Sequence, residues 1–179
     1  LARARFGGLV NMDLIAGLPT DSLEGFQRTL DRVLAMGVAN ITVHTLALKK
    51  GARLMERPED LCTPATVSDM LALGEHALRD AGYQPYYLYR QKYMSGSFEN
   101  VGWCKPGTEC AYNIIMMEEL QTVLSLGAGG VTKLVEPSTG KITRLANPKF
   151  PKEYLDSWEK LAAGKLSAAQ FQARLYQAP

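Results

Sequence analysis

The chain has 179 residues, of which 46% are hydrophobic and 21% are charged, and its formal net charge is +2. These totals are typical of an ordinary globular domain, or of a domain with a small appendage. The low charge and the lack of a Lys/Arg run give no electrostatic case for nucleic acid, and no apolar segment is long enough to span a membrane.

The three cysteines are Cys62, Cys104 and Cys110. Their number is odd and low, which argues against a secreted disulfide framework and for a reducing compartment, here the cytoplasm. Their spacings do not form a zinc quartet. Cys104 and Cys110 are either two ligands of one group or, as the sequence favours, two ordinary thiols around a loop.

The first predicted element is an apolar strand over residues 9–15 that contains one carboxylate, Asp13, and is followed by a Gly-Leu-Pro turn at 17–19. A carboxylate in an apolar strand is costly unless something binds it. Asp13 therefore accepts either hydroxyl donors of a ligand, such as those of ribose, or backbone N–H groups of the adjacent turn.

A helix follows, with Asp21 and Glu24 predicting a capping box at its start and Gly37 predicting its left-handed end. Residues 40–46 are β-branched and predict the next strand. His44 lies on one face of that strand. It is either a packed, hydrogen-bonded residue, the commoner case, or a metal ligand or acid–base group.

The pattern repeats with Thr63 as cap, Pro64 at the first helical position, Gly82 at the helix end and a strand over residues 83–89. Pro85 either begins that strand or lies on an edge. The order strand-helix-strand-helix-strand predicts an α/β fold with parallel strands joined by right-handed crossovers.

Ligands of such folds bind at the carboxyl ends of the strands. This rule selects residues 13–17, 44–49 and 89–91. Arg90 and Gln91 lie at the third of these places. Arg90 is either suited to an acidic substrate, because guanidinium groups bind carboxylates bidentately, or is a surface arginine paired with a local carboxylate.

The second half has a different character. It predicts a long loop over 95–107, a strand or short helix over 110–117, strands over 123–126, 131–135 and 141–145, a glycine turn at 127–130, and two closing helices, the second capped by Ser167. The glycine turn either lets backbone approach a ligand or is a tight connection between strands.

Several motifs occur in order along the chain: residues 11–19 (NMDLIAGLP), 45–48 (TLAL), 86–92 (YYLYRQK), 99–102 (ENVG), 112–113 (YN) and 126–130 (LGAGG). Together they resemble the oxygen-independent coproporphyrinogen III oxidase family of radical S-adenosylmethionine (SAM) enzymes. The stretches at 86–91 and 99–102 most resemble its HemZ-type coproporphyrinogen dehydrogenase branch. The resemblance covers about residues 8–160.

The resemblance implies the C-terminal part of a (β/α)6 partial TIM-type barrel, followed by a small α+β domain. Residues 1–91 would supply the last barrel strands and helices, and residues 92–179 the C-terminal domain. It also implies SAM-contacting positions at Asp13, Ala47, Gly127, Gly129 and Lys133, of which Lys133 departs from the family's usual apolar or small residue. No family role transfers to Arg90 and Gln91, which are candidates for a substrate propionate on chemistry alone.

Members of the family hold a 4Fe–4S cluster with a C-x3-C-x2-C motif, cleave SAM to a 5′-deoxyadenosyl radical, and convert propionate side chains of coproporphyrinogen III to vinyl groups. This sequence lacks that motif and the early barrel strands. We therefore expect a C-terminal fragment that alone binds no cluster and is inactive.

Two further expectations complete the analysis. The alternative function is a relative that carries haem or another tetrapyrrole without oxidising it, with His44, Tyr89 and the cysteines as the ligands to suspect. Without the early barrel strands, the strand over residues 9–15 would be an unpaired edge, and we expect self-association to cover it.

Overall fold

The computed structural model describes residues 8–48, 51–90 and 98–177, and the chain divides into two compact units, Leu1–Asn113 and Ile114–Pro179. The first unit therefore extends beyond residue 91, where the sequence analysis ends the barrel-derived part. The reason is a strand at Asn100–Cys104 that belongs to the first unit's sheet.

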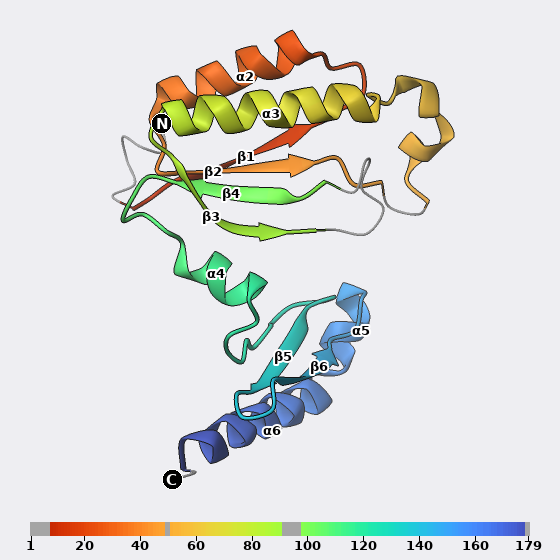
Figure 1. Ribbon diagram of the computed structural model, residues 1–179. Helices are drawn as coiled ribbons and strands as arrows, with labels where there is room; N and C mark the ends of the chain where they lie inside the picture. Colours follow the sequence, from red (N-terminus) through yellow and green to blue (C-terminus); the bar gives the residue numbers. More distant parts are fainter. Residues whose placement is uncertain (1–7, 49–50, 91–97, 178–179) are drawn as a thin grey trace. The chain divides into compact units, whose positions relative to one another are not determined.

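The first unit holds a four-stranded sheet in the order β1-β2-β4-β3 (Figure 1). Its elements in the described residues are β1 (Asn11–Ala16), α2 (Leu23–Met36), β2 (Asn40–Thr45), the short 3-10 turns η1 (Arg53–Glu56) and η2 (Pro58–Asp60), α3 (Pro64–Asp80), β3 (Gln84–Tyr89), β4 (Asn100–Cys104) and α4 (Ala111–Met117), which crosses the division between the units. β1 and β2 are parallel, which confirms the first predicted βαβ unit.

β2 and β3 run in the same direction, as the prediction of parallel strands requires, but they do not pair, because β4 lies between them and is antiparallel to both. Residues 95–107 were predicted to be a loop since Asn and Gly have low strand propensity. In the structure Gly102 is required, because a Cβ there would overlap the ring of Tyr87 on the neighbouring strand. A glycine that lets a neighbouring side chain lie close to the backbone thus gives the same signal in the sequence as a turn glycine.

The helix ends of the first unit follow the predicted signals, except at the start of α2. Thr63 accepts the N–H of Thr66 and Pro64 opens α3, and Gly37 ends α2 with a φ of 60°. The cap of α2, however, is Ser22, whose Oγ accepts the N–H of Gly25 at 3.1 Å. The predicted cap, Asp21, instead accepts the N–H of Ser22.

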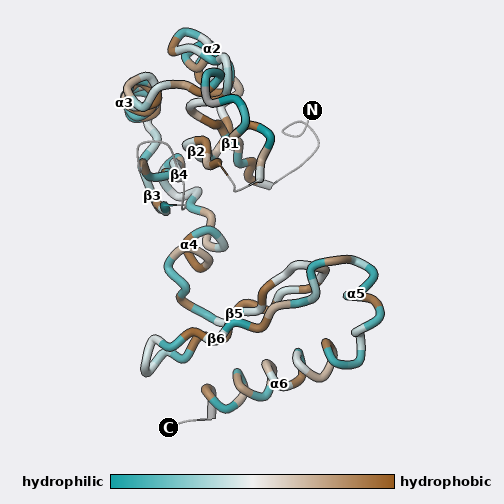
Figure 2. The backbone as a smooth tube through the Cα atoms, turned by 90° about the vertical axis from the view of Figure 1, so that its right-hand side faces the viewer, coloured by the Kyte–Doolittle hydropathy of each residue, from teal (hydrophilic) through white to brown (hydrophobic). Residues whose placement is uncertain are grey.

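Both helices α2 and α3 cover the same face of the sheet (Figures 1 and 2). The side chains between them and the strands form one apolar core, whose largest fully buried members are Phe26, Leu30, Ile41, Met70 and Leu78. Since side chains alternate along a strand, the remaining residues of each strand point to the uncovered face, called the open face below.

The second unit contains the hairpin β5 (Val131–Glu136) and β6 (Lys141–Ala146), with α5 (Pro151–Asp156) and α6 (Trp158–Gln177). α6 packs against β5. The predicted strand over 123–126 is reduced to a single bridge between Val123 and Lys133. The predicted start of the last helix is wrong, because Ser167 lies inside α6 and its Oγ donates to Ala163 O.

β1 is an edge of the four-stranded sheet, as the sequence predicts. Whether a second copy covers it stays a prediction. Among the described residues, no helix has both the length and the apolar character to cross a bilayer.

Candidate functional site

The open face of the first unit carries a row of polar side chains from three strands. Its six members, called the polar row below, are Asn11 and Asp13 of β1, Thr42 and His44 of β2, and Tyr87 and Tyr89 of β3. Each pair is spaced two residues apart in a strand, which is the sequence signal that could have grouped them. Which of these side chains contact one another across the strands, however, depends on the register in which the strands pair.

Asp13 lies at one end of this row, and its side chain is 62% exposed. Its Oδ1 accepts the side-chain amide of Asn11 at 2.7 Å and lies 3.6 Å from His44 Nε2. Among the described residues, no hydrogen bond or ion pair is made to the second oxygen, Oδ2, which leaves it able to accept from a ligand. The alternative in which turn N–H groups hold Asp13 is wrong, since both partners are side chains of the sheet.

His44 joins Asp13 to Tyr89. Its Nδ1 lies 3.1 Å from the Tyr89 hydroxyl, and the two rings meet edge to face with centroids 6.1 Å apart. The imidazole is largely buried, and each of its nitrogens faces a named partner. Sequence analysis singled out His44 but missed its pairing with Asp13, because β1 and β2 are separated by a whole helix.

At the other end of the polar row, side-chain hydrogen bonds connect the strands β1, β2 and β3. Thr42 Oγ1 donates to Asn11 Oδ1 at 3.2 Å and lies 3.1 Å from the Tyr87 hydroxyl. Burial raises the pKa of Tyr87, and the contact with Thr42 partly opposes that shift. The Tyr87 and Tyr89 rings stack with centroids 6.4 Å apart. The row is therefore a connected network, in which moving one member disturbs the others.

Ala47 follows β2 at its carboxyl end and is half-buried. Leu46 N–H donates to Ala16 O, so the ends of β1 and β2 are held side by side. The Gly-Leu-Pro turn begins there with Gly17 at a φ of 86°, and a Cβ at Gly17 would lie 2.8 Å from a methyl group of Val67. The predicted positions Asp13 and Ala47 thus belong to adjacent strands.

The three remaining positions that are predicted to contact SAM lie in the second unit, where each is hydrogen-bonded to another group of that unit. Gly127 N–H donates to the Tyr154 hydroxyl, and Gly129 N–H donates to Pro148 O at 2.7 Å. Both glycines have positive φ angles. Lys133 forms an ion pair with Glu119 at 2.8 Å.

The Oε1 atom of Glu119 forms two ion pairs, because Arg144 also contacts it, at 2.7 Å. The hydrogen bond from Lys133 is the main reason that the pKa of Glu119 is lowered, and the nearby positive charges add to it. The ammonium group of Lys133 is thus already bound to Glu119 in this structure.

Arg90 follows β3 and pairs with Glu99 at 3.2 Å, and both side chains are largely exposed. This is the surface ion pair that the sequence analysis weighed against an acidic substrate. Gln91 lies outside the described residues.

Burial makes Cys62 and Cys104 favour the thiol form. Cys62 donates to Leu18 O at 3.3 Å, and burial raises its pKa. Cys104 is buried, which raises its pKa as well. Within the described ranges, no three His, Cys, Asp or Glu side chains gather as metal ligands.

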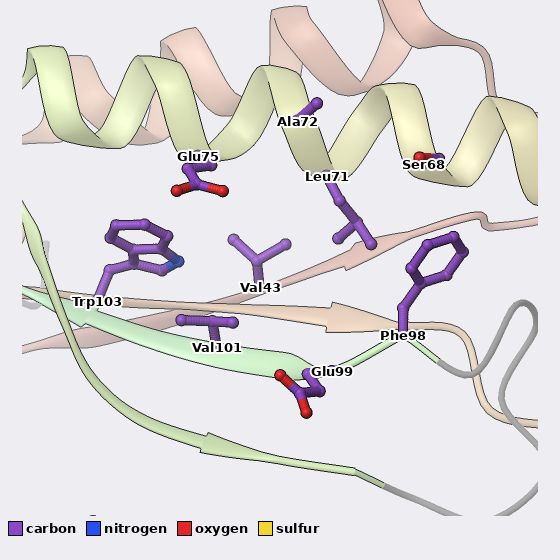
Figure 3. Close-up of a pocket in the computed structure, with 9 residues that line it drawn as sticks. All are labelled: Val43, Ser68, Leu71, Ala72, Glu75, Phe98, Glu99, Val101 and Trp103. Carbon is purple, nitrogen blue, oxygen red and sulfur yellow. The ribbon is translucent and has the colours of Figure 1, made fainter.

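A cavity of about 290 Å³ lies on the covered face, between α3 and the strands β2 and β4 (Figure 3). Its lining is mainly apolar and includes Val43, Leu71 and Trp103. The two carboxylates at this cavity, Glu75 and Glu99, are each paired with an arginine. The cavity lies on the opposite face of the sheet from Asp13 and the polar row.

Comparisons with known proteins agree with the motifs of the sequence. The chain is 39% identical over 159 residues to the oxygen-independent coproporphyrinogen-III oxidase-like protein HemZ of Bacillus subtilis, covering 88% of this chain and 32% of that protein. It is 30% identical over 154 residues to the heme chaperone HemW of Haemophilus influenzae, covering 85% and 37%. No family model matches the sequence.

Among solved structures, the fold resembles coproporphyrinogen III oxidase (HemN) from Escherichia coli, described as a radical SAM enzyme. The TM-score is 0.58 at 20% identity, over 84% of this chain and 34% of that one. The chain therefore spans about a third of the length of the relatives it matches. These findings confirm the resemblance and the mixed α/β fold.

Proposed function

This chain is related by sequence to the oxygen-independent coproporphyrinogen-III oxidase-like proteins, and on that premise we propose that it forms the C-terminal part of a radical SAM coproporphyrinogen dehydrogenase. The whole protein would oxidatively decarboxylate propionate side chains of coproporphyrinogen III to vinyl groups. The role of this chain would be to hold the side of SAM that faces away from the cluster, and to cover the substrate.

The observation that carries this proposal is the accessible Oδ2 of Asp13 on the open face of the sheet. A carboxylate oxygen accepts two hydroxyl hydrogens, which suits the ribose of SAM. Ala47, on the adjacent strand end, is small enough for an adenine to lie against its backbone. When bound to a 4Fe–4S cluster, SAM supplies the one-electron chemistry of the family; the residues here bind and orient it.

The substrate would be anionic, because coproporphyrinogen carries propionates. Arg90, whose side chain is 58% exposed, is the described cation that we propose for one of them. Such a role requires the propionate to replace or share the Glu99 carboxylate. Gln91 is proposed beside it on chemistry alone.

A second candidate function is transport of haem or another tetrapyrrole without oxidation, since the chain is also similar to the heme chaperone HemW. The axial ligands suspected from sequence are poorly placed for it. His44 directs its nitrogens to Tyr89 and Asp13, and Cys62 and Cys104 favour the protonated thiol.

The decisive experiment uses the protein expressed from the complete open reading frame that encodes this chain, reconstituted anaerobically with iron and sulfide. With SAM, a reductant and coproporphyrinogen III, we expect loss of carboxyl groups as carbon dioxide and appearance of vinyl groups by mass spectrometry. Unchanged substrate together with stoichiometric haem binding, seen as a sharp Soret shift, would favour the chaperone function instead.

The 179-residue chain alone provides the matched control. After the same reconstitution we expect no 4Fe–4S absorption band from it, because its cysteines do not form the C-x3-C-x2-C motif. A stoichiometric band from this chain would contradict the expectation.

A further inference from the structure

We propose that His44 is a positioning residue that orients Asp13, so that one carboxylate oxygen is anchored to the sheet and the other is directed to the ligand. The inference rests on the proposed function, since the ligand in question is an adenosine-containing cofactor with free ribose hydroxyls. The similarity to known proteins assigns no role to His44.

The two oxygens of the Asp13 carboxylate have different surroundings. Its Oδ1 faces two donors, the Asn11 amide at 2.7 Å and His44 Nε2 at 3.6 Å, whereas no described group contacts Oδ2. An exposed carboxylate with no anchors would rotate freely. Two donors on one oxygen restrict that rotation and leave Oδ2 as the acceptor for a ligand hydroxyl.

The orientation of the imidazole bears on the same carboxylate. A carboxylate accepts hydrogen bonds only, so the favourable arrangement places a proton on Nε2. In the neutral ring Nδ1 is then the acceptor, and the Tyr89 hydroxyl 3.1 Å away donates to it. The Tyr89 hydroxyl is thus compatible with the tautomer that Asp13 requires, since it can donate to Nδ1.

The polar row also makes this arrangement rigid. Tyr89 stacks on Tyr87, and the Tyr87 hydroxyl lies against Thr42, which in turn donates to Asn11. The network therefore returns to Asn11, the other anchor of Asp13. Contacts in such sites are often long without ligand and shorten when it binds, and we expect the 3.6 Å separation to do so.

The experiment measures the affinity of the protein from the complete open reading frame for S-adenosylhomocysteine, which has the ribose but cannot be reductively cleaved. The variants are Asp13→Ala, His44→Phe, the double variant, and His44→Gln. Phenylalanine keeps the ring shape but removes both nitrogens, while the glutamine amide can replace the Nε2 donor. His76→Phe, an exposed histidine on α3, is the matched control.

We expect Asp13→Ala to weaken binding about tenfold and His44→Phe about fivefold, since each loses hydrogen bonding to a charged group. The double variant should be no weaker than Asp13→Ala, because His44 acts through Asp13. His44→Gln should recover most of the affinity, and His76→Phe should leave it unchanged.

A second measurement tests the geometry without ligand. Nitrogen NMR of the His44 ring in the 179-residue chain should show a protonated Nε2 and an accepting Nδ1, and Tyr89→Phe should weaken that preference. The opposite tautomer would overturn the proposal.

The outcomes separate the two claims. If the wild-type protein binds and the losses of the two single variants simply add, or His44→Phe has no effect, then the positioning role fails while the proposed function stands. If the wild-type protein shows no binding to S-adenosylhomocysteine, the proposed function itself is overturned.

Discussion

The two units treat their candidate ligand-binding groups differently. In the first unit, Asp13 keeps one oxygen without a described hydrogen-bond partner, on the face of the sheet opposite α2 and α3. In the second unit, the N–H groups of Gly127 and Gly129 and the ammonium of Lys133 are all bound to groups of that unit. A ligand could bind the second oxygen of Asp13 directly. Binding at Gly127, Gly129 or Lys133 would require that group to leave its present partner.

The difference follows from how each unit is stabilised. The first has a continuous apolar core between two helices and a sheet, so its stability depends less on the polar groups of the open face. The second is small, and polar contacts hold much of it together. Lys165, for example, donates to the buried Thr132 and to Asn147, which itself holds Gly127 O. Polar groups that maintain a fold are less available for binding.

The largest expected effect tests the core of the first unit. Leu30→Ala removes a fully buried side chain and should cost about 3 kcal/mol of unfolding free energy, through lost burial and a cavity. Urea denaturation in a Trp158→Phe background would isolate the fluorescence of Trp103. The matched control is Leu155→Ala on the surface of α5, where an equal loss would contradict the comparison.

The next effect tests the packing beneath the polar row. Gly102→Ala places a methyl group into the ring of Tyr87, and we expect a loss of about 1–3 kcal/mol from overpacking. Gly164→Ala in α6, where a Cβ meets no atom within 4 Å, should instead stabilise slightly, as alanine favours helix. If Gly164→Ala lowers the free energy of unfolding and Gly102→Ala does not, the expectation is contradicted and the ring of Tyr87 moves aside.

A smaller effect is expected at Glu119 and depends on pH. Its pKa is lowered in the folded chain, so its contribution is present above the unfolded glutamate pKa and is lost as pH falls through the folded value. Glu119→Gln should therefore destabilise the second unit at pH 7, and the difference should vanish in acid. Peptide-resolved hydrogen exchange at several pH values measures it; a constant difference would exclude the ion pairs as its cause.

The smallest effect on stability is expected for Lys133→Met, about 0.5 kcal/mol or less, because a partly exposed ion pair contributes little. The same variant is also used in a second measurement, the affinity of the complete protein for S-adenosylhomocysteine. Unchanged affinity would mean that Lys133 serves only Glu119 and would sharpen the contrast between the units. Weakened affinity would mean that Lys133 leaves Glu119 for the ligand.

Sequence alone predicts the features that depend on neighbours along the chain. The strands around Asp13 and His44 and the Thr63 cap follow from local patterns. β4 could not be predicted in this way, because Gly102 is explained only by the ring of Tyr87 on another strand. Asp13 was recognised, but its link to His44 and Tyr89 depends on register across three strands.

The place of β4 in the sheet also bears on the order in which the chain can fold. β3 has no partner in the sheet except β4, and β4 must reach across to β2, where Cys104 pairs with Asn40. During synthesis β1, α2, β2 and α3 can assemble as a local βαβ-like unit, but Tyr87 and Tyr89 gain their places only after residues 100–104 leave the ribosome. Such non-local pairing slows folding. The imidazole of His44 therefore acquires its tyrosine partner as one of the last events in the folding of the first unit.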